Sequence, residues 1–208
     1  PPRSTLFPYT TLFRSDWLNG RSGEKPEMSH TVFKNWVVPE MKEGKPTFLV
    51  VIDNLRLDQW KIIQEANSDD FRIDEERTFL SILPTATQYA RNSLFAGLLP
   101  SEIQKRFPQY WMNEDDEGSK NQFEEQLLVE QIKRLGKQYS HSYAKITNLN
   151  FGKKVSEGLH SLVHNDLNVI VYNFVDMLSH ARTEMEVIRE LADDESAYRS
   201  LTLSWFEH

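Results

Sequence analysis

Residues 47–52 read TFLVVI and are followed by Asp53, and they carry the clearest indication of the fold. This stretch is almost continuously apolar and rich in β-branched residues, a pattern typical of a strand that is buried on both faces of a parallel sheet. Asp53 then stands at the carboxyl end of this strand. A second apolar run, residues 167–175, contains the sequence VIV and predicts another buried strand.

Segments with helical spacing surround these two strands. Because strands alternate with helices, the chain predicts an α/β domain with a mostly parallel sheet sandwiched by helices. A third strand is expected within residues 139–146, an extended segment over 71–83 and a loop over 107–120. The expected helices cover residues 29–41, 57–66, 121–135, 149–164, 183–192 and 196–206. A further helix is expected to begin after a turn at Thr85 and to end near Gly97.

Composition narrows the class of protein. The chain has 208 residues, of which 39% are apolar and 26% charged, as in globular domains. No apolar run approaches the roughly 20 residues that a membrane helix needs, so we expect no membrane partner. The absence of cysteine excludes disulfides and thiolate metal sites and fits a cytoplasmic location. A net charge of -7 argues against binding nucleic acid by counterion release alone.

Both ends of the sequence suggest a piece of a longer protein. Residues 5–15 read TLFPYTTLFRS, which is similar to the translation of a common sequencing adapter, so we expect residues 1–15 to be an artefact. A genuine strand is the alternative. Residues 16–45 are expected to form a linker or helical connector, and residues 46–208 a domain. The last residues stop inside an amphipathic pattern, so we expect the core to be incomplete at its C-terminus.

Three side chains follow the ends of the expected strands. Ligands of open α/β sheets gather at the carboxyl ends of the strands, where Asp53 ends the first strand and Asp176 and His180 follow the second. Carboxylate oxygens and imidazole nitrogens are ordinary zinc ligands. Asp176 and His180 can face one cation if the backbone between them turns. The alternatives are a helix cap or strand-end turn for Asp53 and a structural role for the other two.

A pair of threonines precedes the helix that ends near Gly97. The sequence PTAT, residues 84–87, contains Thr85 and Thr87. Threonine at a helix start usually caps it. A helix N-terminus also attracts phosphate, and a hydroxyl activated there by a metal can attack phosphorus.

Three segments together resemble alkaline-phosphatase-like enzymes, in order along the chain. The middle segment is similar to the nucleophile region of nucleotide pyrophosphatases and phosphodiesterases, which implies that Thr87, rather than Thr85, is the nucleophile. The segments are VVIDNLR at residues 50–56, PTATQYARNSLFAGLLP at residues 84–100 and NFVDMLSHAR at residues 173–182.

The wording VIDNLRLDQW, LPTATQYARN and NFVDMLSHARTE more specifically resembles the PglZ domain of PorX-like response regulators of type IX secretion. The resemblance implies an alkaline-phosphatase-like core with two divalent metals, zinc by preference and manganese as the alternative. It implies that Asp53 and Thr87 hold one metal and that Asp176 and His180 hold the other. The family's later Asp-His pair and further His are not found after His180, so we expect the chain as given to be inactive.

The resemblance also implies the activity and its partners. It implies hydrolysis of a nucleotide-like phosphodiester, either a small molecule or an oligonucleotide, and regulatory partners that act through a receiver domain absent from this sequence. Asn54, Arg56 and Arg91 are the candidates for substrate binding. Arg91 lies one helical turn after Thr87, where it can reach a phosphate or pair with Asp53; an ion pair that positions the helix is the alternative.

The alternatives from two other classes of function are an interaction module, which stays open, and a nucleotide binder, which is disfavoured. A non-catalytic output or interaction module of a secretion regulator would keep the fold and act through partner contacts. A Rossmann-like nucleotide binder is disfavoured, because the sequence has no glycine-rich phosphate loop of either common type.

Overall fold

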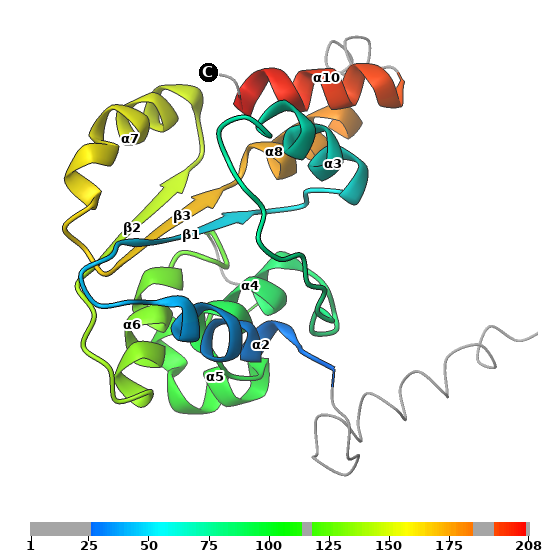
Figure 1. Cartoon of the computed structure of the whole chain (residues 1–208). Coiled ribbons are helices and arrows are strands. Elements are labelled where there is room, and N and C mark those ends of the chain that lie inside the picture. The colour runs from blue at the N-terminus through cyan, green and yellow to red at the C-terminus, as the bar shows by residue number, and fades with distance from the viewer. Residues whose placement is uncertain (1–25, 114–117, 185–193, 207–208) are drawn as a thin grey trace, which may run out of the picture. The chain divides into compact units, whose positions relative to one another are not determined.

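The computed structural model describes residues 26–113, 118–184 and 194–206 (Figure 1). The chain divides into two compact units, each built from two stretches of sequence. The first, called the helical unit, comprises Pro1–Asn35 and Arg77–Gln131. The second, called the sheet unit, comprises Trp36–Glu76 and Ile132–His208. Each unit is described by itself.

The sheet unit contains a three-stranded parallel sheet of order β1-β3-β2. The strands are β1 (Thr47–Ile52), β2 (His141–Ile146) and β3 (Leu167–Tyr172). In the register, Ile52 and Ile146 both pair with Tyr172. All three strands therefore end at the same level, and the residues that follow them share one edge of the sheet.

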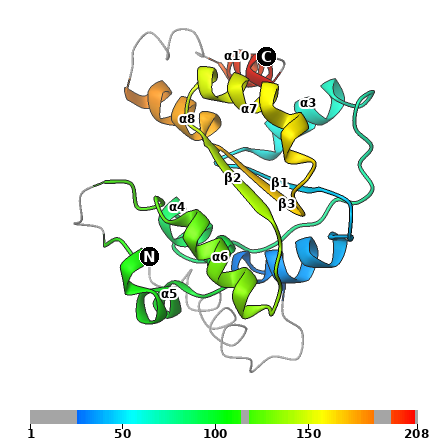
Figure 2. The ribbon, with the colours of Figure 1, turned by 90° about the vertical axis from the view of Figure 1, so that its left-hand side faces the viewer.

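Four helices of the sheet unit lie on one side of this sheet, as the two views agree (Figures 1 and 2). Three of them follow a strand directly and α10 is the last described element. They are α3 (Leu57–Ala66), α7 (Leu149–Leu162), α8 (Phe174–Glu184) and α10 (Glu195–Phe206). The predicted α/β class with a parallel sheet flanked by helices is thus confirmed.

Burial differs sharply between the two strands that the sequence predicts to be buried. Leu167, Val169 and Val171 of the central strand β3 are fully buried. On β1 the prediction of burial on both faces is wrong: Phe48 is 41% and Val50 52% exposed. The reason is position, since β1 pairs only with β3 and lies at an edge of the described sheet.

The helical unit packs short helices around an apolar core. It holds α2 (Ser29–Val32), α4 (Thr87–Ala96), α5 (Pro100–Arg106), the 3-10 turn η4 (Pro108–Tyr110) and most of α6 (Glu124–Arg134). Phe95 of α4, Ile103 of α5 and Leu127 of α6 are at most 1% exposed and supply the core.

Two local differences from the sequence prediction have physical causes. The helix expected over 29–41 continues after α2 as a π-turn, η2 (Phe33–Val37), and a 3-10 turn, η3 (Val38–Glu40), which contains the helix-breaking Pro39. Helix α5 was not predicted. Pro100 at its first position and Glu102, whose Oε2 accepts the Leu99 N–H at 3.0 Å, start it.

Some predictions fall on residues outside the described ranges. These are the adapter-like residues 1–15, residues 114–117 of the loop expected over 107–120, and nearly all of the helix expected over 183–192. Among the residues that are described, no helix is long and apolar enough to cross a membrane.

Candidate functional site

Asp53 occupies the first position after β1, in a tight turn. Its N–H donates to the carbonyl oxygen of Tyr172 at 3.1 Å, which extends the β1–β3 ladder by one bond. Asn54 follows with φ 59°, a left-handed conformation that asparagine tolerates better than most residues. The N–H of Asn173, directly after β3, donates to the Ile146 oxygen at 3.1 Å. Asp53 and Asn173 therefore share the carboxyl edge of the sheet.

Asp176 and His180 lie four residues apart on α8, so one helical turn brings them together. The Nε2 atom of His180 is 3.7 Å from Oδ1 of Asp176. The expected strand stops at Tyr172, and a continuous helix replaces the turning backbone expected between them. The His180 side chain is 67% exposed and the Asp176 side chain 25%, so solvent reaches both donors.

The side chains of Asp176 and His180 are of the kinds that bind a divalent metal, but two ligands are fewer than a metal site needs. A carboxylate oxygen and an imidazole nitrogen on one face of a helix are suited to share a cation such as zinc. Within the described ranges, no group of three or more His, Asp or Glu side chains is arranged to hold a metal ion. Asp176 and His180 would therefore supply two ligands of a larger set.

Thr87 is the first residue of α4, in the helical unit. The N-cap position belongs to Ala86, and no side chain caps the helix there. Thr87 therefore lies one position after the N-cap. Its carbonyl oxygen accepts a hydrogen bond from Nδ2 of Asn121 at 3.1 Å. Asp53, Asp176 and His180 lie in the sheet unit, and their convergence with Thr87 stays a prediction.

Arg91 forms the ion pair that the sequence left as the alternative to phosphate binding. Its Nε donates to Oε1 of Glu124 at 2.7 Å and its Nη2 donates to Oε2 at 2.6 Å. The two side chains are 6% and 1% exposed. The fork-to-fork geometry ties α4 to α6 inside the helical unit.

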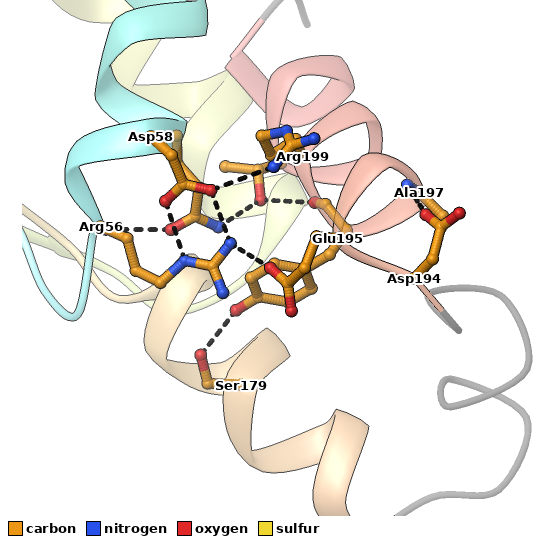
Figure 3. A network of polar contacts seen from close by, with 10 residues as sticks. Arg56, Asp58, Ser179, Asp194, Glu195, Ala197 and Arg199 are labelled. Carbon is orange, nitrogen blue, oxygen red and sulfur yellow. Dashed lines mark hydrogen bonds and ion pairs between the residues drawn. The ribbon is translucent and has the colours of Figure 1, made fainter.

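Arg56, another candidate for substrate binding, is also engaged by carboxylates (Figure 3). Its guanidinium lies between Asp58 on α3, at 2.8 Å, and Glu195 on α10. It also stacks over the Tyr198 ring, with Cζ 5.1 Å from the centroid. Its hydrogen bonds to Asp58, and then those to Glu195, raise the pKa of Arg56 above its ordinary value. Asn54, the remaining candidate for substrate binding, lies two residues before Arg56 and is exposed.

A shallow apolar groove in the sheet unit contains none of the predicted site residues. Its volume is ≈ 250 Å³. Tyr172 in its wall stacks on Phe206 with ring centroids 4.9 Å apart, and burial raises the pKa of Tyr172 to about 12. Val50, Ile170, Tyr172, Leu149, Leu159 and Phe206 are among its lining residues.

Sequence reasoning missed several residues that hold the candidate residues in place. Asn121 and Glu124 secure α4, and Glu195 and Tyr198 secure Arg56. Each contact joins residues far apart in sequence, so local spacing carries no signal for it. For Glu124, its place in the first turn of a helix is ordinary for an acidic residue and does not point to a fully buried side chain.

Comparison with protein-family models gives one family for most of the chain. Residues 32–203 match the PglZ model, described as the BREX system PglZ alkaline phosphatase-like domain. The matched range includes all the candidate site residues named above. A search of curated proteins found no match.

Proposed function

The chain belongs to the PglZ alkaline phosphatase-like family, and from that premise we propose that it is a metal-dependent phosphoester hydrolase with Thr87 as its nucleophile. The observation that carries the proposal is the position of Thr87. It stands at the first position of α4, inside the range that matches the family. The positive end of a helix dipole favours the negative charge of a phosphoester at that position.

The proposed reaction proceeds in two displacements at phosphorus. The Thr87 Oγ attacks, an Oγ–P bond forms, and the bond from phosphorus to the leaving oxygen breaks. The Thr87 proton passes to solvent, and the leaving oxygen takes up a proton as it departs. Water then attacks the phosphothreonine, which releases the phosphate product and restores the hydroxyl. Thr87 is thus regenerated, and the net change is hydrolysis of one phosphoester bond.

Four side chains would hold the metals in this proposal: Asp53 and Thr87 for one, Asp176 and His180 for the other. Divalent cations supply positive charge that stabilises the charge on the oxygens around phosphorus and lowers the pKa of the hydroxyl. The donor chemistry favours zinc, with manganese as the alternative. The 3.7 Å approach of Asp176 and His180 supports the second pair.

Narrower features of the function are part of the same proposal. A small nucleotide-like phosphodiester is the substrate class that the family implies. Among the candidates for binding it, we favour the exposed Asn54 over Arg56 and Arg91, which are paired with carboxylates. The segment wording at Asp53, Thr87 and Asp176 supports a role in a PorX-like response regulator of type IX secretion.

The test is hydrolysis of a chromogenic phosphodiester, bis(p-nitrophenyl) phosphate, by the complete gene product with zinc or manganese added. Thr87→Val should abolish turnover, because it keeps the shape of the side chain and removes the oxygen. Thr85→Val is the matched control and should retain activity. Full activity of Thr87→Val would refute the nucleophile. If the unaltered protein hydrolyses no phosphoester with either metal, the result favours the alternative of a non-catalytic interaction module.

A further inference from the structure

Buried polar side chains of α4 and of residues 121–124 form a cluster in the helical unit. We call it the α4 polar cluster; it comprises Arg91, Asn92, Asn121 and Glu124, all within the helical unit. As whole residues, they are at most 8% exposed. Burying polar groups costs free energy unless each is hydrogen-bonded. Four of them in one place, next to the proposed nucleophile, therefore call for a reason beyond filling space.

The base of the cluster is the ion pair between Arg91 and Glu124. Two short, parallel bonds of 2.7 Å and 2.6 Å join them. Removing either partner of a buried pair leaves the other charge without its counterion, which is strongly unfavourable. The pair therefore holds the Glu124 carboxylate in one orientation.

Glu124 in turn orients Asn121. The Nδ2 atom of Asn121 lies 3.3 Å from Oε1 of Glu124 and 3.3 Å from Oδ1 of Asn92. Asn92 is anchored separately, because its own Nδ2 donates to the carbonyl oxygen of Lys120 at 3.1 Å. With acceptors on both sides, the Asn121 amide presents its N–H groups in a fixed direction.

Thr87 supplies a third acceptor to the same amide, whose two N–H groups are thus shared among three oxygens. Nδ2 of Asn121 donates to the Thr87 carbonyl oxygen at 3.1 Å. This bond restrains the peptide of the first helical residue from outside its own helix. Threonine is β-branched and stiff at χ1, so a fixed backbone at Thr87 leaves its hydroxyl few directions to point.

We propose that Asn121, oriented by the Arg91–Glu124 pair, is a positioning residue that aims the Thr87 hydroxyl. Arg91 then serves the reaction through Glu124 and Asn121 rather than through the substrate. The inference rests on the proposed function, since it concerns the same nucleophile. A nucleophile out of place by about 1 Å can cost about 100-fold in rate, so the loss of Asn121 should lower kcat while substrate binding is kept.

The experiment compares Asn121→Ala with the unaltered complete gene product in the phosphodiester assay. We expect kcat to fall by about 10- to 100-fold with KM within about twofold. Asn35→Ala is the matched control, because Asn35 is exposed and pairs with Glu27. It should leave both constants unchanged. Should Asn121→Ala fail to fold, Asn121→Ser, whose shorter side chain does not reach Thr87, replaces it with the same expectation.

A second measurement separates positioning from general loosening. Hydrogen exchange of the amides at residues 87–91 should quicken in Asn121→Ala while that of the central strand β3 stays as it was. Unchanged exchange at residues 87–91, unchanged kcat, or a rise in KM alone would each overturn the inference. A fall in kcat equally large in Asn35→Ala would do the same.

The same series distinguishes this inference from the proposed function. If Thr87→Val is inactive and Asn121→Ala is fully active, only the positioning role fails. If Thr87→Val is active, the proposed function fails, and the exchange measurement still decides whether Asn121 restrains the first turn of α4.

Discussion

Gly97 ends α4 in a conformation and a space that other residues fit badly. Its φ is 60°, in the left-handed region, and its N–H donates to the Ser93 oxygen at 2.9 Å. A Cβ built on Gly97 would meet the side-chain amide of Gln131, whose carbon Cδ would lie at 2.7 Å. With its amide turned so that the nitrogen faces α4, Gln131 donates to the carbonyl oxygens of Leu94 and Phe95. The glycine thus lets Gln131 close the end of the helix.

Replacement of Gly97 by alanine should destabilise the protein by more than about 1 kcal/mol, because strain and a steric clash add. Chemical unfolding measures the change. Gly136→Ala is the matched control: φ is 67° there, but nothing lies within 4 Å of the new Cβ, so only strain remains. Equal losses for the two variants would mean that the contact with Gln131 has no energetic consequence.

At the scale of elements, three helices of the sheet unit are held together by polar side chains (Figure 3). Gln59 is 1% exposed; its Oε1 accepts the Arg56 N–H at 2.9 Å, which caps α3, and its Nε2 donates to Oγ1 of Thr202 on α10, also at 2.9 Å. The Tyr198 hydroxyl of α10 lies 2.6 Å from Oγ of Ser179 on α8. Helix α10 therefore fixes the helices that follow β1 and β3.

Thr202→Val should destabilise the protein by about 1–3 kcal/mol, because the buried Gln59 amide loses its acceptor while the volume of the side chain is kept. The measurement is the free energy of unfolding in urea. Ser204→Ala, on the same helix, is the control; its hydroxyl is half-buried and donates to the Leu201 oxygen. A change below about 0.5 kcal/mol would place Thr202→Val among ordinary surface substitutions and show that this link is dispensable.

Elements with strong local signals were predictable from the sequence. The bounds of β1 and α3 agree with the prediction, because an unbroken apolar run and a regular helical spacing are local properties. The αL glycine after α4 was recognised for the same reason. Burial of β1 was predicted wrongly, since exposure depends on which strands lie beside it. In the candidate site, Asp176 and His180 approach each other because a helix replaces the expected strand end, and the Glu124 partner of Arg91 lies 33 residues away and left no local trace.

At the scale of the whole molecule, several carboxylates make folding depend on pH. A hydrogen bond from Arg56 lowers the pKa of Asp58, and the Ser140 hydroxyl and N–H lower that of Asp166. Lys61 lowers the pKa of Glu76. In each case the unfolded chain binds a proton more readily than the folded one. These groups therefore contribute stability above their ordinary pKa near 4, and that contribution is lost as pH falls through the lowered values.

The thermal unfolding midpoint should accordingly fall as the pH is lowered from about 5 to about 2, and the fall should be shallower in Ser140→Ala. That variant removes one donor to Asp166, whose Oδ2 accepts the Ser140 hydroxyl at 2.7 Å and the N–H at 2.8 Å. Differential scanning calorimetry across this range tests the expectation. A midpoint that rises on acidification would contradict the sign of all three shifts.

The position of β3 between its neighbours has a consequence for how the chain is made. Strands β1 and β2 form no ladder with each other, and both wait for β3, whose first residue pairs with Thr47 about 120 positions earlier. During translation, no part of this sheet can form until Leu167–Tyr172 has left the ribosome. The nascent chain thus keeps the apolar β1 segment without a partner while the residues up to Leu167 are made, which is the interval in which a chaperone would protect it from aggregation.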